Sequence, residues 1–292
     1  MINVDIGIIG AGRVGCAFGI GLKNSNFSVS GVYSKSDKSQ IYLNKKLKGR
    51  YANDLKDTIE NSKIILMTVP DDSIGAVAKR IVTNIPQKFL HSKIFIHLSG
   101  AMSSEVLEPL RGMGGHIASL HPAQTFADKE NGWKGLYDIY YGFEGCKEAE
   151  DNILKIVKAF RGKIVHVDRG DKPLYHMAAC IISNYTVTLS HIAQEILKSI
   201  GIEQSSAREI FVPLIMNTVY NIQKYGSVDA LTGPIARGDC SVVKEHLRAL
   251  GSLKPKMGNI YKVLGNATVD LALEKESISD EEAKKIKNLF LS

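Results

Sequence analysis

The sequence predicts an α/β domain with a largely parallel sheet, residues 1–168, followed by an all-helical domain, residues 169–292. Seven short β-like runs alternate with helical stretches as far as Asp168, and such alternation is typical of right-handed βαβ crossovers. From Lys172 onward the β-like runs stop and long amphipathic stretches follow. A chain of 292 residues is long enough to form two domains.

The expected elements can be assigned in chain order. The predicted strands are residues 4–10, 27–34, 63–69, 93–99, 116–122, 140–145 and 163–168. The predicted helices of the second domain are residues 172–200, 204–225, 240–250, 254–275 and 279–291. Two of these helices contain a Ser-x-x-Glu capping box, Ser206 with Glu209 and Ser279 with Glu282, which satisfies free backbone donors at a helix start.

The composition is that of an ordinary globular protein, with 44% hydrophobic and 23% charged residues. No apolar run reaches the roughly 18–20 residues of a membrane span. The first ten residues lack the basic region of a signal peptide. The four cysteines are far apart without a Cys-x-x-Cys pair, so we expect no metal, no disulfide framework and a cytoplasmic location.

The net charge of +7 comes from lysines spread along the chain, and no motif for reading nucleic acid accompanies them. We therefore expect neither nucleic acid nor a membrane among the partners. A general positive field suits an anionic cofactor and a small anionic substrate.

A glycine-rich turn follows the first predicted strand directly and precedes a predicted helix. It comprises Gly10, Ala11, Gly12, Arg13, Val14 and Gly15. Glycines in this spacing allow a tight turn, a close approach of the backbone to a pyrophosphate, and close packing of the helix on the strand. The pyrophosphate would lie at the helix N-terminus, where free N–H groups favour an anion. The turn therefore predicts dinucleotide binding, whereas the alternative is a glycine turn without a ligand.

The end of the second strand indicates which dinucleotide binds. NAD-binding sites place an acidic residue there to hold the ribose hydroxyls. Here Ser34, Lys35 and Ser36 follow the strand, and the first acid is Asp37. Two hydroxyls and a lysine can bind a 2′-phosphate, so the sequence favours NADP(H) over NAD(H). The alternative is that this segment is only a polar turn.

Other segments end at the same predicted edge of the sheet, where ligands bind in this architecture. The expected cofactor contacts there are Val69, Pro70 and Ser99, and the expected substrate contacts are His121 and Gln124. For Asp71 and Asp72, which follow the third strand, we favour a helix N-cap.

The first helix after the boundary carries polar residues among apolar ones. At 3.6 residues per turn, positions 172, 176, 179 and 183 fall within an arc of roughly 60°. Lys172, His176 and Ser183 then form one stripe, and Asn184 lies off its centre. A buried lysine without a partner would cost several kcal/mol, so we expect the stripe to face a wet cleft. The alternative is a helix packed at a domain interface.

These residues suit the reduction of a carbonyl, which needs a proton for the developing alkoxide. Lys172 can stabilise that charge as it forms, and His176 can share proton delivery near neutral pH. We expect both to be catalytic, with Ser183 and Asn184 binding substrate. Arg237 lies in a loop between two helices and can bind a carboxylate bidentately, although a surface Arg–Asp pair is the alternative.

Five segments together resemble a known family: "IGIIGAGRVG", "HLSGA", "SLHPAQTF", "KPLYHMAACIISNY" and "LTGPIARGD". They resemble a family of Rossmann-like oxidoreductases, formerly of unknown function, whose C-terminal helical domain is similar to that of 6-phosphogluconate dehydrogenase. The resemblance implies an alternative ketopantoate reductase, which makes pantoate for pantothenate and coenzyme A synthesis, and a homodimer through the helical domain.

In related ketopantoate reductases and β-hydroxyacid dehydrogenases, a catalytic lysine opens the first helix of the second domain. Lys172 matches it. An asparagine is usual one turn later, where this sequence has His176, and Asn184 is interpreted as that asparagine displaced in register.

The sequence thus predicts an NADPH-dependent reductase of a small 2-keto acid, with 2-dehydropantoate as the leading substrate. One alternative is the reduction of a cyclic imine such as pyrroline-5-carboxylate, against which a cation at Lys172 would count. The other alternative is an NADP-binding sensor without turnover. The sequence leaves open whether Lys172 or His176 delivers the proton.

Overall fold

The computed structural model describes residues 2–48, 54–251 and 255–291. The chain divides into two compact units, which meet in the sequence between Asn184 and Tyr185. Each unit is described separately below.

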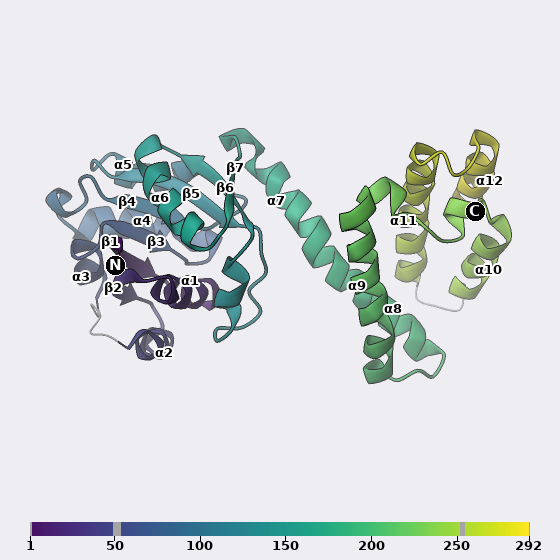
Figure 1. The fold of residues 1–292 in the computed structure, drawn as a ribbon, viewed down its shortest axis with the longest axis horizontal. Helices are drawn as coiled ribbons and strands as arrows, with labels where there is room; N and C mark the ends of the chain where they lie inside the picture. Colours follow the sequence, from purple (N-terminus) through teal and green to yellow (C-terminus); the bar gives the residue numbers. More distant parts are fainter. Residues whose placement is uncertain (1, 49–53, 252–254, 292) are drawn as a thin grey trace. The chain divides into compact units, whose positions relative to one another are not determined.

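The first unit contains a seven-stranded sheet with the order β2-β1-β3-β4-β5-β6-β7 (Figure 1). The strands are β1 (Ile2–Ile9), β2 (Phe27–Tyr33), β3 (Ile64–Met67), β4 (Ile94–His97), β5 (His116–Pro122), β6 (Tyr140–Gly145) and β7 (Lys163–His166). All neighbouring pairs are parallel except β5 with β6. The predicted, largely parallel α/β sheet is therefore confirmed.

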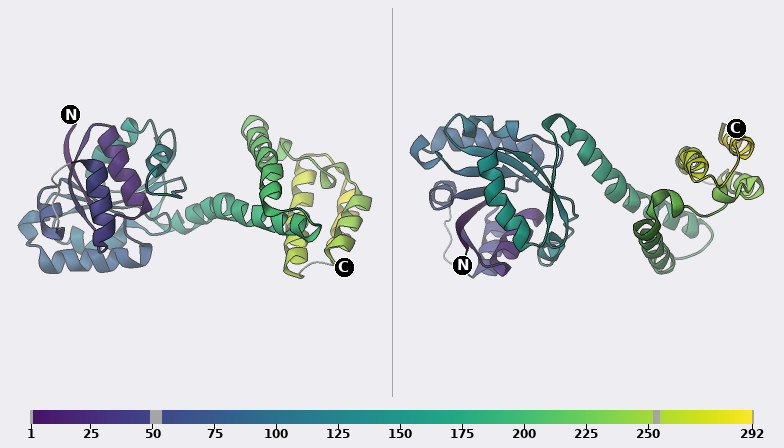
Figure 2. Two further views of the ribbon diagram at one scale, coloured as in Figure 1. Left: turned by 90° about the horizontal axis from the view of Figure 1, so that it is seen from below. Right: turned by 45° about the horizontal axis from the view of Figure 1, so that its top comes forward.

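Helices cover both faces of this sheet (Figure 2). One face packs against α1 (Arg13–Asn24), α2 (Asp37–Leu47) and α6 (Lys147–Ala159), and the other against α3 (Leu55–Glu60), α4 (Asp71–Asn84) and α5 (Glu108–Arg111). Every residue of β3 and β4 is buried, because a parallel strand between two helical layers has no face left for water. Short helical turns are η1 (Gln87–Phe89), η2 (Ser104–Leu107), η3 (Gly132–Leu136) and η4 (Arg169–Asp171).

The predicted helix over residues 172–200 contains an interruption. It consists of α7 (Lys172–Cys180), a π-helical segment η5 (Ile181–Tyr185) and α8 (Thr186–Ser199). The strands end with β7, as the predicted boundary after Asp168 implies, but the first compact unit continues to Asn184. The reason is that α7 packs on the sheet through Lys172, which bonds to Ser119 of β5.

The second unit is helical, as predicted. It contains α8, α9 (Gln204–Asp229), η6 (Ile235–Arg237), α10 (Cys240–Leu250), α11 (Pro255–Glu274) and α12 (Asp280–Leu291). Its buried core joins residues of α10, α11 and α12. Within the described ranges, no helix combines the length and apolar character that a membrane span requires.

One of the two predicted capping boxes is confirmed. The Ser279 hydroxyl accepts from Glu282 N (3.3 Å), and the Glu282 carboxylate accepts from Ser279 N (2.8 Å). The other is wrong, because α9 begins at Gln204 with Glu203 as its N-cap and no side-chain cap bond. Ser206 therefore lies inside the first turn rather than before it.

The glycine-rich turn between β1 and α1 depends on two glycines for different reasons. Gly10 has φ 107°, in the region that favours glycine. A Cβ on Gly15 would lie 2.0 Å from Gly10 O and 2.6 Å from Thr68 Oγ1, so only glycine lets α1 approach β1 this closely. Around Gly12 nothing lies within 4 Å of such a Cβ, so the second glycine faces open space.

This geometry predicts unequal effects of adding one methyl group. Gly15→Ala should lower the free energy of unfolding by about 1–3 kcal/mol through overpacking, measured by urea denaturation. The matched control Gly12→Ala should lose less than about 1 kcal/mol, since its added methyl meets no atom. Equal losses in the two variants would contradict the packing role assigned to Gly15.

Candidate functional site

The predicted cofactor and substrate segments meet at one edge of the sheet. Strands β1 to β5 are mutually parallel, so their carboxyl ends lie on the same side. The predicted segments at these ends are Gly10–Gly15, Ser34–Ser36, Val69–Pro70, Ser99 and His121–Gln124, of which His121 and Pro122 are the last residues of β5. Strand order reverses at β1, which has β2 on one side and β3 on the other, and such a switch point forms a ligand crevice.

The N-terminus of α1 has the properties of an anion site. Its N-cap is Gly12, no side chain caps it, and its first turn contains no acidic residue. The free N–H groups and the open space at Gly12 fit the pyrophosphate of a dinucleotide. This part of the prediction is consistent with the geometry of the loop.

Two residues of the segment after β2 make local hydrogen bonds. Ser34 N donates to Gln40 Oε1 (2.8 Å), and the Ser36 hydroxyl caps α2 by accepting from Ser39 N (3.3 Å). Lys35 is exposed. A phosphate at this position would therefore meet Lys35 and the Ser36 hydroxyl, which also has a structural role.

The segments after β3 and β4 bond to each other. Asp71 begins α4 and Pro70 is its N-cap, so the expected N-cap role of Asp71 and Asp72 is wrong. Asp71 Oδ2 instead accepts from the Ser99 hydroxyl at 2.6 Å. That hydroxyl also accepts from Ala101 N (3.2 Å), so it organises the turn after β4, and contact of Ser99 with a cofactor stays a prediction.

A cavity of about 360 Å³ lies beside the carboxyl end of β5. Its walls are formed by the end of β5, the loop after this strand, α7 and the π-helical segment η5. Its lining residues are His121, Ala123, Gln124, Thr125, His176, Ala179, Cys180, Ile182, Ser183 and Asn184. Five predicted residues, His121, Gln124, His176, Ser183 and Asn184, thus lie around one cavity.

Asn184 lines the cavity because the helix is not regular at this point. A π-helical segment contains more residues per turn than the 3.6 used to predict the stripe. The register therefore shifts between Cys180 and Tyr185, so that Ser183 and its neighbour Asn184 both line the cavity.

Two histidines face each other in this cavity. The ring centroids of His121 and His176 are 5.8 Å apart with the planes at 81°. Gly100 makes the pairing possible, since a Cβ there would lie 2.6 Å from His176 Cδ2 and 2.9 Å from His121 Nε2. On its other side His121 Nδ1 lies 3.3 Å from the hydroxyl of Tyr175. The sequence does not predict the contacts that Gly100 and Tyr175 make with these rings, because they are long-range.

The cavity chemistry is that of a neutral imidazole beside a second imidazole and a thiol. Burial, with smaller effects of His176 and Lys172, lowers the pKa of His121 to about 4. His121 is therefore uncharged at neutral pH and can donate a proton from one nitrogen while accepting at the other. Cys180 Sγ lies 3.8 Å from His176 Nδ1 and 3.8 Å from Nε2.

Lys172 is not where the sequence placed it. Its side chain is fully buried, it does not line the cavity, and its Nζ donates to Ser119 Oγ at 2.6 Å. The expected wet cleft at this lysine is therefore wrong, because β5 supplies a hydroxyl partner within the packed interior. Burial lowers the pKa of Lys172, and the Glu144 and Asp71 carboxylates oppose that change.

A buried polar network surrounds this lysine. Ser119 Oγ donates to Ser99 O (3.2 Å), while Ser99 N donates to His97 Nδ1 (3.2 Å). Nδ1 of His97 is therefore an acceptor, so Nε2 is the donor to Ser103 O (3.1 Å) and the ring is neutral. Burial lowers the pKa of His97 to about 4, in agreement with this pattern.

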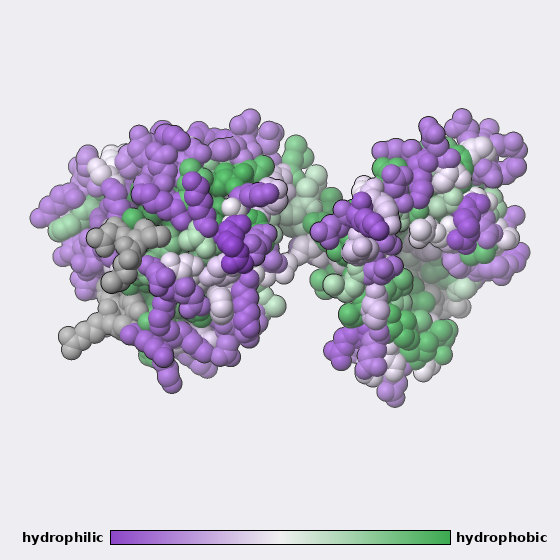
Figure 3. All heavy atoms as spheres, viewed as in Figure 1, coloured by the Kyte–Doolittle hydropathy of each residue, from purple (hydrophilic) through white to green (hydrophobic). Residues whose placement is uncertain are grey.

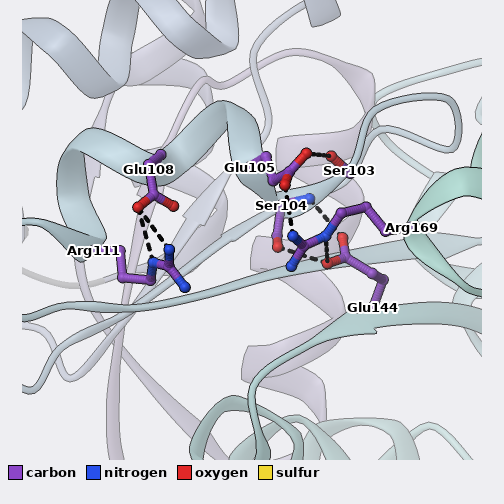
Figure 4. A network of polar contacts seen from close by, with 7 residues as sticks. All are labelled: Ser103, Ser104, Glu105, Glu108, Arg111, Glu144 and Arg169. Carbon is purple, nitrogen blue, oxygen red and sulfur yellow. Dashed lines mark hydrogen bonds and ion pairs between the residues drawn. The ribbon is translucent and has the colours of Figure 1, made fainter.

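The carboxylate of Glu144 on β6 is held by a second network, drawn in Figure 4. Its oxygens accept from Ser104 N (2.5 Å) and Ser104 Oγ (2.8 Å). Arg169 reaches Glu144 Oε1 at 3.4 Å and Glu105 Oε1 at 2.6 Å. These bonds keep a buried negative charge in the neighbourhood of Lys172.

Arg237 belongs to the second unit, where it ends η6, and its role in binding substrate stays a prediction. The nearby Asp239 carboxylate caps α10 by accepting from Val242 N (3.2 Å).

One group of residues could hold a metal ion among those that the structure describes. The ligand atoms of His116, Cys146 and Glu148 lie within 4.8 Å of one another. His116 begins β5, so the group is at the sheet edge opposite the cavity. The expectation of no metal stays a prediction.

Comparison with known proteins agrees with the two-part architecture. Residues 2–122 match a Rossmann-like domain, and residues 139–268 match a domain of unknown function, DUF2520. No curated protein matches the chain.

Three solved structures illustrate the fold. A Bacteroides fragilis protein, provisionally assigned as an NADP oxidoreductase, is 24% identical, with 91% of this chain and 98% of that chain covered and a TM-score of 0.75. A protein of Thermotoga maritima is 25% identical over 98% of both chains, with a TM-score of 0.64. A Plasmodium falciparum pyrroline carboxylate reductase with NADP bound is 15% identical over 99% of both chains, with a TM-score of 0.59.

The comparisons therefore support a Rossmann-like domain followed by a DUF2520 region, in a fold shared with reductases. The DUF2520 match begins with β6 and β7 of the sheet and continues into the helical unit. The specific resemblance to ketopantoate reductase is not confirmed by them and stays a prediction.

The neutral state of His97 predicts an acid-sensitive fold. Its folded pKa of about 4 lies below the usual 6.5, so between these values the unfolded chain binds a proton that the folded chain does not. Stability is therefore lost as the pH falls through this range, by up to about 3 kcal/mol from this residue.

The change His97→Gln removes that titration. Urea denaturation at a series of pH values from 8 downward should show that the free energy of unfolding falls less in the variant than in wild type. Above both pKa values, the difference in the free energy of unfolding between the two proteins should stay constant. If the stability of the two proteins fell equally with pH, His97 would not be the neutral, buried group that we describe.

Proposed function

We propose that the chain is an NADPH-dependent reductase of a small carbonyl or imine compound. One observation carries this proposal. A cavity lined by two facing histidines lies at the carboxyl edge of the sheet, on the same edge as an uncapped, glycine-initiated helix N-terminus. The first feature suits proton transfer to a small substrate and the second suits a dinucleotide.

The coenzyme part rests on the residues Gly10–Gly15 and Ser34–Ser36. The open Gly12 and the free N–H groups of α1 would hold the pyrophosphate, and Lys35 would contact a 2′-phosphate. The Plasmodium reductase with the same fold is a structure with NADP bound, which supports this choice. When bound, NADPH supplies the hydride.

Residues of the chain itself would donate the proton that the reduction requires. His121 is neutral and faces His176 across Gly100, so either imidazole can donate to an oxygen or nitrogen that gains electron density. Tyr175 orients His121 through the 3.3 Å contact at Nδ1. Lys172 lies outside the cavity, so we assign it a positioning role in place of the catalytic one expected from the sequence.

The leading substrate remains a small 2-keto acid, with 2-dehydropantoate first. Support comes from the five motifs that resemble ketopantoate reductases, two of which contain cavity residues or Lys172. Ser183, Asn184 and Gln124 offer hydrogen bonds to the polar groups of such a compound.

A cyclic imine is the second candidate, and one observation favours it. The cation that would disfavour a protonated imine, Lys172, is buried away from the cavity. The similarity in fold to a pyrroline carboxylate reductase points the same way.

A panel assay tests the function. NADPH oxidation should be seen with 2-dehydropantoate or with pyrroline-5-carboxylate, and His176→Ala should lower kcat by about 10²–10⁴-fold if this ring takes part in proton transfer. Lys172→Met is compared with His176→Ala. Because we assign Lys172 a positioning role, its loss should lower the free energy of unfolding as well as kcat. Tight NADPH binding without oxidation of any substrate would instead favour a sensor.

We also propose that the protein is a homodimer through its helical unit. Helix α9 has exposed apolar side chains on all sides, among them Ile210, Val212, Leu214 and Val219, and Figure 3 shows apolar side chains gathered on this unit's surface. A helix that is apolar all round is normally enclosed by protein. An apolar cavity of about 450 Å³ between α8 and α11 adds to this surface, and a second copy is the occupant that the resemblance implies.

Leu214→Asp should therefore convert the dimer to a monomer, as measured by light scattering on a size-exclusion column. The charge would be buried in the interface at a cost of several kcal/mol. Ile41→Asp in α2 is the matched control, because Ile41 is 66% exposed and Leu214 is 60% exposed. A wild-type monomer, or dimers in both variants, would refute the proposed interface.

A further inference from the structure

We infer that Lys129, in the loop between β5 and β6, completes the binding site for the 2′-phosphate of the coenzyme and sets the preference for NADPH over NADH. This inference rests on the proposed function and adds a specificity-determining residue to it. Lys129 is distant in sequence from the glycine-rich turn and from Ser34–Ser36, and neither of these motifs points to it.

The first observation is where the ammonium lies. Lys129 Nζ donates to Ser39 Oγ at 2.9 Å, across 90 residues of sequence. Ser39 in turn is bonded to Ser36, since its N–H lies 3.3 Å from Ser36 Oγ and 3.0 Å from Ser36 O. The lysine therefore lies against the first turn of α2, directly beside the segment predicted to meet the 2′-phosphate.

The second observation is that the same place borders the glycine-rich turn. Gly10 N donates to Tyr33 O at 2.7 Å, which joins this turn to the end of β2. The charge of Lys129 also acts on Cys16, in the first turns of α1, where it opposes the effect of burial that raises the pKa of this thiol. Lys129 is thus close to both segments that would hold the adenosine half of a dinucleotide.

The third observation concerns charge. Among the residues that the structure describes, no ion pair joins Lys129 to a carboxylate, and the hydrogen-bond acceptor found for its ammonium is a neutral hydroxyl. The neighbouring Lys46 differs, because it pairs with Glu130 at 2.7 Å. Lys129 is half-buried and lies 5.9 Å from the centre of the Tyr42 ring. The Lys129 ammonium therefore has no anionic partner among the described residues, and a phosphate dianion would provide one.

The loop holds this lysine in place before any ligand arrives. Asp128 Oδ1 accepts from Glu130 N (2.7 Å) and Asn131 N (2.6 Å), which closes a tight turn around residue 129. The Lys46–Glu130 pair ties the turn to α2. Because the side chain is already positioned, little conformational entropy would be lost when a phosphate binds.

The experiment compares the dissociation constants of NADPH and NADH, followed by the fluorescence of the reduced coenzymes. Lys129→Ala should weaken NADPH binding by about tenfold or more and NADH binding by less than about twofold, because a charged hydrogen bond to phosphate is lost. Lys129→Glu should reverse the preference. Lys134→Ala, an exposed lysine on the same loop, is the matched control and should change neither constant.

Added salt gives an independent readout, since screening should reduce the selectivity of wild type more than that of Lys129→Ala. Equal losses for the two coenzymes in Lys129→Ala would overturn the inference and leave Lys129 as a loop tether. Unchanged NADPH affinity would overturn it as well. If wild type binds neither coenzyme, the proposed function itself fails, which is a different result from a loss of selectivity.

Discussion

The arrangement of the candidate site depends on one buried hydrogen bond, from Lys172 Nζ to Ser119 Oγ. It holds the start of α7 against the middle of β5, and one turn later His176 meets His121 at the end of that strand. An ammonium in a packed interior costs several kcal/mol unless it is compensated. The carboxylates of Glu144 and Asp71 offset part of this cost. The bond therefore connects the register of α7 to the geometry of the cavity.

Burial gives the site a neutral hydrogen-bonding character. His97 and His121 both have a pKa lowered to about 4, so neither ring carries a charge at neutral pH. The positive charge of Lys172 contributes to both shifts, although it is outside the cavity. A neutral imidazole can pass a proton in either direction, whereas a permanent cation at the same place would repel a protonated substrate.

The coenzyme side of the site has a different organisation. The anion binding that we propose there would use backbone N–H groups at the start of α1 and side chains that come from α2 and from the loop after β5, where Lys129 bonds to Ser39. The hydroxyls of Ser36 and Ser99, two of the predicted coenzyme contacts, stabilise local turns. The predicted coenzyme contacts and the local stability therefore involve some of the same residues at the carboxyl edge of the sheet.

The sequence by itself determined the seven strands, their alternation with helices in a largely parallel sheet, the glycine-rich turn and the helical second half, because periodicity and backbone hydrogen bonding are local properties. It also identified five residues around the cavity. Only the tertiary structure decided that Lys172 is buried, that the π-helical segment brings Asn184 to the cavity, and that Lys129 contacts Ser39. These features come from contacts between residues 53 or 90 positions apart, or from a local change of helical register, and neither leaves a periodic signal in the sequence.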